Sequence, residues 1–213
     1  HDAFIGIGGG VITDMTAFAA SIYKRGAKLH LIPTTLLAMV DAAIGGKTGC
    51  DFGNSKNMIG TFFPFHHLYI TSEFIQTLPQ NEYLSGLAEV IKTALLYDKE
   101  LFELLENNTE QILNKDKNII DIMIQKCSNA KCNVVKEDLT EQGIRKQLNL
   151  GHTFGHALES LCGLGSITHG EAVAWGIARS YQLSNNLNFC DSSIKDRIFT
   201  ILQNYGFVVS TKH

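Results

Sequence analysis

Hydrophobic residues near the N-terminus form two short runs, and each run passes into a segment with helical spacing. The first run, FIGIGGG at residues 4–10, ends in three glycines. A helical pattern follows it, which we expect Thr13 or Asp14 to cap and Gly26 to end. The second run, KLHLIP at residues 28–33, passes into TTLLAMVDAAIGG. This alternation of strand and helix is typical of a parallel α/β sheet.

The pattern changes after Thr71. From there the strand signals fade, and PQNEYLSGLAEVIKTALLYDKELFELLENN, NIIDIMIQKCSNAKCNVVKED and the segment at residues 148–162 all carry helical periodicity. No repeat or Pro/Ser linker separates the two halves. The sequence therefore predicts an α/β part at residues 1–74 and an all-helical domain at residues 75–213.

Composition narrows the classes of function. The chain of 213 residues is 45% hydrophobic and 18% charged, which indicates a globular protein. With 18 Lys plus Arg against 21 Asp plus Glu, it has no global positive field for nucleic acid or an acidic membrane. Apolar stretches fall short of a bilayer span, and the five cysteines form no CxxC, so we expect a cytoplasmic protein. The chain enters its first strand directly after His1, which suggests a fragment.

Two glycine-rich segments are candidates for binding phosphate groups. Glycines at residues 8–10 stand where a strand passes into a helix, and there backbone amides can approach a pyrophosphate. The strict GxGxxG motif is absent because residue 11 is Val, so a plain tight turn remains an alternative. The segment GGKTGCDFGNSKN at residues 45–57 supplies backbone amides and the side chains of Lys47, Lys56 and Asn57. It fits either a phosphate site or a mobile surface loop.

The densest set of potential metal ligands lies in LNLGHTFGHALES, residues 148–160. Four polar residues recur there at helical spacings and are expected to share one face: Asn149, His152, His156 and Glu159. Two histidines at i and i+4 can bind one metal ion, although an isolated pair is more often part of a core or surface. His169, at a later helix start, is a further candidate ligand.

A carboxylate on the first helix of the helical part is a candidate third ligand. Glu89 lies beside Ser85 and Gly86, whose small side chains are expected to leave room next to it. One carboxylate and two imidazoles make the three-ligand set of a catalytic zinc site, which keeps one position open. The alternative for Glu89 is an exposed i,i+3 ion pair with Lys92.

Two further cations stand out. Lys131 has apolar neighbours at helical spacing, so it either extends its amine to solvent or holds an anion. Arg145, four residues before Asn149, would grip a carboxylate if it points into the same space, and both residues also fit ordinary surface cations. The cysteines are predicted to be small core residues.

Taken in series, the motifs resemble those of the 3-dehydroquinate synthase family over nearly the whole chain. The segments that carry the resemblance are GIGGGVITDMTAF, YKRG, IPTTLLAMVDAAIGGKTG, SKNMIGTFFP, TLPQNEYLSGLAEVIK, KCNVVKEDLTEQGIRKQLNLGHTFGHALE and HGEAVAWG. The resemblance implies a Rossmann-like nucleotide-binding part followed by a helical metal-binding domain, in a cytoplasmic homodimer. The implied reaction converts the sugar acid phosphate DAHP into 3-dehydroquinate and phosphate, with NAD+ reduced and reoxidised in one turnover.

The resemblance also implies roles for individual residues. A Zn2+ or Co2+ ion would be held by Glu89, His152 and His169. NAD+ would be contacted by Gly9, Gly10, Asp14, Thr34, Thr35, Asp41, Lys56 and Thr77. Catalytic roles would fall to Lys47, Asn57, Lys92 and His156. Substrate would be bound by Arg25, Lys131, Arg145 and Asn149, with Arg25 reaching the phosphate in the neighbouring subunit.

Two departures from the family qualify these expectations. Complete members have more chain at both ends, so this polypeptide alone is expected to bind NAD+ weakly and to turn over slowly or not at all. CDFGNS at residues 50–55 differs from many relatives, and related cyclases act on other sugar phosphates. The competing interpretations are a metal- and NAD(P)-dependent polyol or glycerol-phosphate dehydrogenase, which would accumulate NADH, and a non-catalytic metal-binding remnant.

Overall fold

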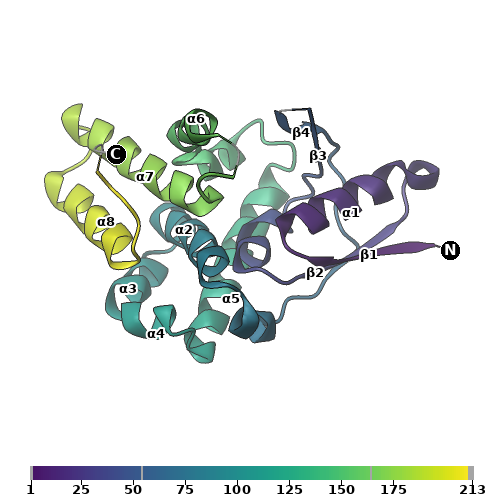
Figure 1. Cartoon of the computed structure of the whole chain (residues 1–213), viewed down its shortest axis with the longest axis horizontal. Coiled ribbons are helices and arrows are strands. Elements are labelled where there is room, and N and C mark those ends of the chain that lie inside the picture. Colours follow the sequence, from purple (N-terminus) through teal and green to yellow (C-terminus); the bar gives the residue numbers. More distant parts are fainter. Residues whose placement is uncertain (1, 54, 164, 211–213) are drawn as a thin grey trace.

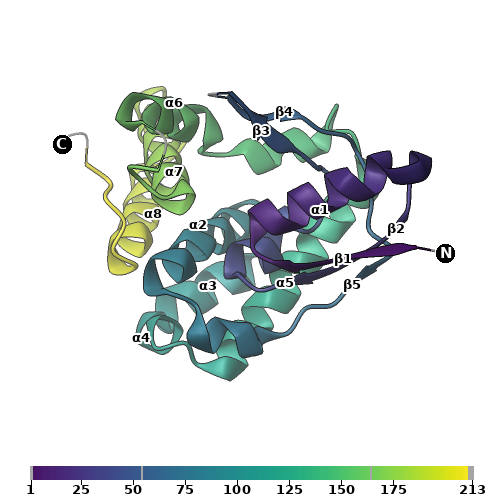
Figure 2. The same ribbon diagram turned by 45° about the vertical axis from the view of Figure 1, so that its right-hand side comes forward.

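The N-terminal part is a small parallel sheet with one helix against it. We describe the protein from a computed structural model, which covers residues 2–53, 55–163 and 165–210 and leaves the side chains of residues 51 and 55–57 undescribed. The strands lie in the order β1–β2–β5, and α1 connects β1 to β2 and lies across the sheet (Figure 2). Their bounds are β1 (Ala3–Gly8), α1 (Gly10–Ile22), β2 (Lys28–Pro33) and β5 (His67–Leu68). The predicted α/β layer is confirmed.

Only one face of this sheet is covered by the described residues. Leu29 and Leu31 of β2 are buried against Ala17 and Ala20 of α1. On β1, Ile5 is 62% exposed and Ile7 is 58% exposed, so the strand presents apolar side chains to solvent. Parallel sheets are normally buried on both faces. The described part of the chain therefore leaves an apolar sheet face open.

The first helix begins one turn earlier than predicted. Its N-cap is Gly9, in an extended conformation, and neither Thr13 nor Asp14 caps it. The glycines allow a close approach, because a Cβ on Gly9 would lie 3.0 Å from Thr35. The Thr13 hydroxyl instead donates to the Gly10 carbonyl at 2.8 Å. The backbone amides without an intrahelical acceptor are therefore those of the first turn of α1, which begins directly after Gly9.

Between β2 and β5 the chain forms a short π-helical turn (Ala38–Ala42) and an antiparallel hairpin of β3 (Cys50–Phe52) and β4 (Ser55–Ile59). The segment that we expected to be a phosphate site or a mobile loop thus has strand structure. Lys47 extends its pairing through a bridge to Phe62. π-helical turns are rare and often occur at functional sites.

The rest of the chain is helical, as predicted, and Figure 1 shows it beside the α/β layer. Its helices are α2 (Gln80–Tyr97), α3 (Lys99–Asn107), α4 (Thr109–Leu113), α5 (Lys117–Glu137), α6 (His152–Cys162), α7 (His169–Asn186) and α8 (Ser192–Asn204). Short 3-10 turns lie in this part at Ser72–Thr77 and Ile144–Asn149, and another follows α1 at Tyr23–Arg25. Most of α2 is buried, including every residue from Ser85 to Ala94, so it is the central helix of the core. The division at residue 74 stays a prediction.

The predicted helix at residues 148–162 is broken in the structure. Gly151 has φ of +83° and caps α6, which begins at His152, while Asn149 ends the preceding 3-10 turn. Glycine adopts this left-handed conformation without steric cost, so the helix starts there. The prediction that Asn149 shares a helical face with His152, His156 and Glu159 is therefore wrong.

Helices α6 and α7 pack with their backbones in contact. A Cβ on Gly176 would lie 1.9 Å from the carbonyl oxygen of Gly151, and a Cβ on Gly155 would lie 2.8 Å from that of Ala172. Side chains at these positions would push the helices apart. The glycines thus determine how closely the first residues of α6 and α7 approach the same region of α2.

We expect Gly176→Ala to lower the free energy of unfolding by about 1–3 kcal/mol, because the added methyl group meets backbone that cannot rotate away. Urea unfolding followed by circular dichroism measures this. Leu183→Ala, at an exposed position of the same helix, is the control and is expected to change stability little. Equal stability of Gly176→Ala and the control would contradict the close packing.

The cysteines are not all core residues. Cys127 is buried, but Cys162 is exposed and the other three are intermediate, so the prediction is right for Cys127 alone. The helical periodicity placed Cys162 at the end of α6, where the chain turns toward solvent. Among the described residues, no helix combines the length and the apolar character needed to cross a bilayer.

Candidate active site

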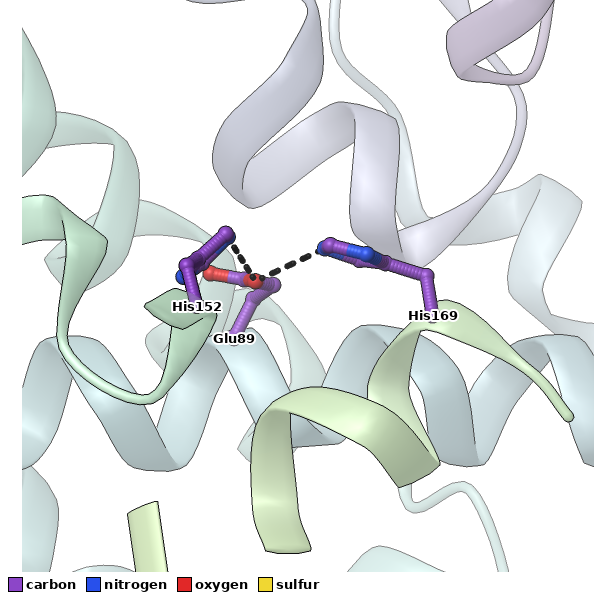
Figure 3. Close-up of side chains that lie close together, drawn as sticks. All are labelled: Glu89, His152 and His169. Atoms are coloured by element: carbon purple, nitrogen blue, oxygen red, sulfur yellow. Dashed lines mark hydrogen bonds and ion pairs between the residues drawn. The ribbon is translucent and has the colours of Figure 1, made fainter. Parts of the chain in front are cut away.

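Three potential metal ligands from three helices converge on one point. Glu89 is fully buried on α2, and its Oε1 lies 3.3 Å from Nε2 of His169 and 3.7 Å from Nε2 of His152 (Figure 3). His152 is the first residue of α6 and His169 the first of α7. One ligand atom from each lies within 4.8 Å of the others. Residues up to 80 positions apart thus form a compact set of one oxygen and two nitrogens.

Small residues on α2 make this convergence possible, though not by leaving empty room as we expected. A Cβ on Gly86 would lie 2.6 Å from Leu36, and a Cβ on Gly170 would lie 2.3 Å from Cα of Ser85. The backbone amide of Gly170 donates to Oγ of Ser85 at 3.0 Å. The space beside Glu89 is therefore filled by neighbouring backbone, and this close contact brings His169 to the carboxylate.

The imidazoles are oriented so that Nε2 faces inward in both. Nδ1 of His152 lies 3.3 Å from the carbonyl oxygen of Leu150, and Nδ1 of His169 lies 3.9 Å from Oε1 of Glu159. With Nδ1 directed at these acceptors, Nε2 of each ring faces the carboxylate. Nε2 of His169 and Oε1 of Glu89 lie 3.3 Å apart and share a proton, and a divalent ion bound by the three groups would take the place of that proton. The donor set therefore fits a divalent ion such as zinc or cobalt.

The electrostatics of the set depend on buried pairing. Lys92 is 1% exposed and forms an ion pair with Oε2 of Glu89, so the alternative of an exposed i,i+3 pair is wrong and the pair lies in the core. Burial raises the pKa of Glu89, but the Lys92 charge together with His169 and His152 outweighs burial, and the net shift is downward. Burial lowers the pKa of His169, and Glu159 and Glu89 overcome it, raising the pKa to about 9. Glu89 is thus held as a carboxylate.

A second group of potential ligands shares His169. His156, Glu159 and His169 each place a ligand atom within 4.8 Å of the others. His156 is exposed, and its ring centre lies 5.3 Å from that of His152 and 6.4 Å from that of His169. It lies beside the buried set rather than within it.

Next to the metal-ligand set lies a cavity of about 430 Å3, lined from both halves of the protein. Seven of the residues singled out from the sequence line it: Asp14, Asp41, Lys47, Lys92, Lys131, Arg145 and Asn149. Four of these are cations and two are carboxylates. Glu141 adds a third carboxylate, so the lining has one more cation than acid and favours an anionic ligand. The α/β part and the helical part therefore contribute to one cleft.

Buried pairs hold the cations of this cavity in place. Lys131 is 7% exposed and contacts both the carboxylate and the carbonyl oxygen of Asp41, so the interpretation that its amine extends to solvent is wrong, and binding of a ligand anion stays a prediction. Burial raises the pKa of Asp41, but the charges of Lys131 and Lys92 and the hydrogen bond from Lys131 together outweigh it, and the net shift is downward. Arg145, 2% exposed, donates from Nη1 to the carbonyls of Gly45 and Leu139, at 2.9 Å and 2.6 Å.

Glu141 is a cavity residue that the sequence reasoning missed. It pairs with Lys47 and accepts from Nδ2 of Asn149 at 2.6 Å. Its φ of +60° lies in the left-handed region, which is uncommon for a residue with a side chain. The sequence signal was available, because Glu141 lies four residues before Arg145 in a turn-forming segment.

The residues expected to contact NAD+ are partly assembled. Gly9, Gly10, Thr34 and Thr35 meet at the carboxyl ends of β1 and β2, where the Thr34 amide donates to the Gly8 carbonyl at 2.9 Å. Asp14 and Asp41 follow at the cavity wall. Thr77 is exposed on the Ser72–Thr77 turn, and its hydroxyl bonds to the Phe74 carbonyl. Lys56 lies in β4, and its side chain, like that of Asn57, is outside the described residues.

Arg25 is exposed at the far end of α1 from the glycine turn. A helix of 13 residues separates the two, which corresponds to about 20 Å. The structure therefore does not bring Arg25 to the cavity of its own chain.

Asp14 should make stability depend on pH. Burial raises its pKa to about 7, although the Lys131 charge opposes the shift. Its unfolded pKa is about 4, so between about pH 4 and 7 the folded protein binds more protons and stability falls as pH rises. Asp14→Asn is expected to gain stability relative to wild type across this window. Melting temperatures at pH 4.5 and 8 test it, with the exposed Asp121→Asn as control; a constant difference would contradict it.

Comparison with known families decides where the chain belongs. The model of the 3-dehydroquinate synthase N-terminal region matches residues 1–85, and that of the C-terminal region matches residues 86–213. The chain belongs to the 3-dehydroquinate synthase family. Relatives include the 3-dehydroquinate synthases of Thermodesulfovibrio yellowstonii, 46% identical over 97% of this chain, and Saccharolobus solfataricus, 45% identical over 96%. This chain spans 57% and 58% of their lengths.

Solved structures of cyclases share the fold. The 2-epi-5-epi-valiolone synthase from Streptomyces hygroscopicus subsp. jinggangensis, with NAD+ and Zn2+ bound, is 31% identical with a TM-score of 0.91 over 98% of this chain and 58% of its own. A 2-deoxy-scyllo-inosose synthase with carbaglucose-6-phosphate, NAD+ and Co2+ is 27% identical, with a TM-score of 0.89 over 96% and 55%. A probable glycerol dehydrogenase from Sinorhizobium meliloti, 16% identical with a TM-score of 0.64, shares the fold alone.

Proposed function

We propose that this protein acts in the conversion of DAHP to 3-dehydroquinate and phosphate, as a phosphate-eliminating lyase that uses NAD+ catalytically. The observation that carries the proposal is the metal-ligand set of Glu89, His152 and His169 beside a cavity lined by four cations. The substrate is an anion with a carboxylate and a phosphate, and it needs such a cavity. The reaction is inferred from membership of the family. The geometry explains why the site contains a carboxylate, two imidazoles and several cations.

We assign the divalent ion to Glu89, His152 and His169. A bound zinc or cobalt ion would act as a Lewis acid on substrate hydroxyl oxygens. Lys92 pairs with Oε2 of Glu89 and also faces the cavity, so the buried carboxylate has a counter-charge while its Oε1 stays directed at the histidines.

We assign recognition of the two anionic ends of the substrate to different cations. Arg145 uses only Nη1 in its backbone bonds, so its other donors suit a carboxylate, and Lys131 and Asn149 line the same wall. Lys47 is the more exposed cation, with Asn57 following on the hairpin, and these two suit the phosphate. His156, exposed beside the metal-ligand set, is placed to exchange a proton with solvent, which suits a general acid or base.

NAD+ is assigned to the glycine turn, with Gly9, Gly10, Asp14, Thr34, Thr35, Asp41, Lys56 and Thr77 as its contacts. Bound there, it would accept a hydride and return it, so no net oxidation results. The free backbone amides at the start of α1 would favour binding of the pyrophosphate group of NAD+. Arg25, exposed and distant, is assigned to the site of a second subunit in a homodimer. Five free cysteines support a reducing, cytoplasmic setting.

One assay separates this proposal from its competitors. The full-length gene product receives DAHP, NAD+ and a divalent metal, and inorganic phosphate and NADH absorbance are followed together. Phosphate release without accumulation of NADH is expected. NADH in proportion to substrate would indicate a polyol or glycerol-phosphate dehydrogenase, and metal uptake without either product would indicate a non-catalytic remnant. The 213-residue chain alone is expected to release phosphate slowly or not at all.

A further inference from the structure

We propose that Glu159 is a positioning residue, which fixes the ring of His169 so that Nε2 presents its lone pair to the metal ion. The inference rests on the proposed metal set of Glu89, His152 and His169. It assigns a role to a carboxylate that lies outside that set, and it interprets the second ligand group, His156, Glu159 and His169, as an orienting contact rather than a second metal site.

The contact comes from the far side of the imidazole. Oε1 of Glu159 lies 3.9 Å from Nδ1 of His169, while Nε2 of the same ring lies 3.3 Å from Oε1 of Glu89. The carboxylate and the metal-binding point are therefore on opposite edges of one ring. At this ion-pair distance the carboxylate attracts a proton to Nδ1, which favours the tautomer with the lone pair on Nε2 and raises the basicity of the ring.

The burial of Glu159 is unusual for a helix carboxylate. It is 8% exposed, whereas His156 on the same helix is exposed. Buried carboxylates are stable only with a partner, and the His169 ring supplies one. A residue that served only to keep α6 soluble would have no reason to face inward.

Close packing of α6 on α7 sets this contact. Gly155 lies one turn before Glu159, and a Cβ on it would meet the Ala172 carbonyl at 2.8 Å. Ala172 is three residues after His169. The contact at Gly155 therefore brings the turn of α6 that carries Glu159 next to the first turn of α7. Thr168 fixes that first turn through a capping box with Glu171. Glu159 and His169 are thus placed by the same helix pair.

His152 has an equivalent arrangement with a different acceptor. Its Nδ1 lies 3.3 Å from the Leu150 carbonyl, which is backbone and cannot be altered by substitution. Both ligand histidines are therefore oriented through Nδ1. Glu159 is the one orienting acceptor of the two that a substitution can remove without touching a ligand.

The test measures metal binding by the full-length gene product, with zinc affinity from a competing chelator and the visible spectrum of the cobalt form. Glu159→Ala is expected to weaken zinc by about 10–100-fold and to change the cobalt bands, because His169 loses its fixed orientation. Glu159→Gln keeps an acceptor oxygen and is expected to recover most of the affinity and the wild-type spectrum. Ser160→Ala, exposed on the same helix, is the matched control.

Zinc affinity of Glu159→Ala within twofold of wild type would overturn the inference while leaving the metal set intact. Should Glu159→Ala fail to fold, Glu159→Asp decides, because the shorter side chain withdraws the carboxylate and is expected to weaken zinc. Two metal equivalents in wild type, falling to one in His156→Ala, would instead make Glu159 a ligand. Failure of wild type to bind zinc at all would refute the proposed function rather than this inference.

Discussion

Glu89→Ala, in metal-free protein, is expected to lower the free energy of unfolding by about 3–5 kcal/mol, because it leaves the Lys92 ammonium buried without its partner. Both side chains are almost fully buried, at 1% and 2% exposure. Burial lowers the pKa of Lys92, but Glu89 and Asp41 outweigh it and the net shift is upward, so the lysine enters the fold charged. Urea unfolding in the presence of a chelator measures the loss.

A double variant separates the buried charge from the metal. Glu89→Gln with Lys92→Met removes both charges and keeps the volume, and replacing a buried pair in this way is often neutral. We expect it to recover most of the stability and still to bind no zinc. Glu103→Ala breaks the exposed pair with Lys99 and serves as the matched control, with little change expected. A double variant as unstable as Glu89→Ala would show that the cost is not the unpaired lysine.

His152→Ala and His169→Ala are each expected to lose stoichiometric zinc and to lower turnover about 1,000-fold or more, since a bound metal ion contributes several kcal/mol of transition-state stabilisation. Metal content is measured by atomic absorption after dialysis, and turnover by phosphate release from the full-length gene product. Both variants retain the buried ion pair of Glu89 and Lys92, so we expect both to fold.

His156→Ala provides the comparison within the same helix. It removes an exposed imidazole beside the set and is expected to keep one equivalent of zinc while lowering turnover about 100- to 10,000-fold, the range of general acid–base catalysis. Loss of zinc from His156→Ala, or its retention in His169→Ala, would mean that the ligand set is wrongly assigned.

The two-part organisation was accessible from the sequence because local periodicity reports it directly. β1 and β2 are short apolar runs that end at glycines or Pro33, and α2 and α5 carry long helical periodicity. The start of α1 was placed wrongly because a side-chain cap is the usual signal, whereas here Gly9 occupies that position without one. The break at Gly151 was missed because glycine marks a left-handed residue only when the neighbouring packing requires it.

The chemistry of the site was partly accessible. Residue types at helical spacing indicated a metal site involving His152, His156, His169 and Glu89, but spacing alone could not choose among the histidines. Glu141 was missed because its partners, Lys47 and Asn149, lie in separate segments. The i,i+3 pair of Glu89 and Lys92 is buried, whereas the alternative drawn from the sequence was an exposed pair, because sequence gives the spacing of two residues and not how tightly the protein packs around them.

The sequence by itself determined the family, the order of strands and helices, and the set of side chains capable of binding a metal and an anion. These follow from residue identity and from contacts between neighbours along the chain. Only the tertiary structure decided that Glu89 meets the inner nitrogens of His152 and His169, with Glu159 on the outer edge of His169. Those contacts depend on how closely glycine-bearing helices pack, and that distance is set by atoms far apart in the chain.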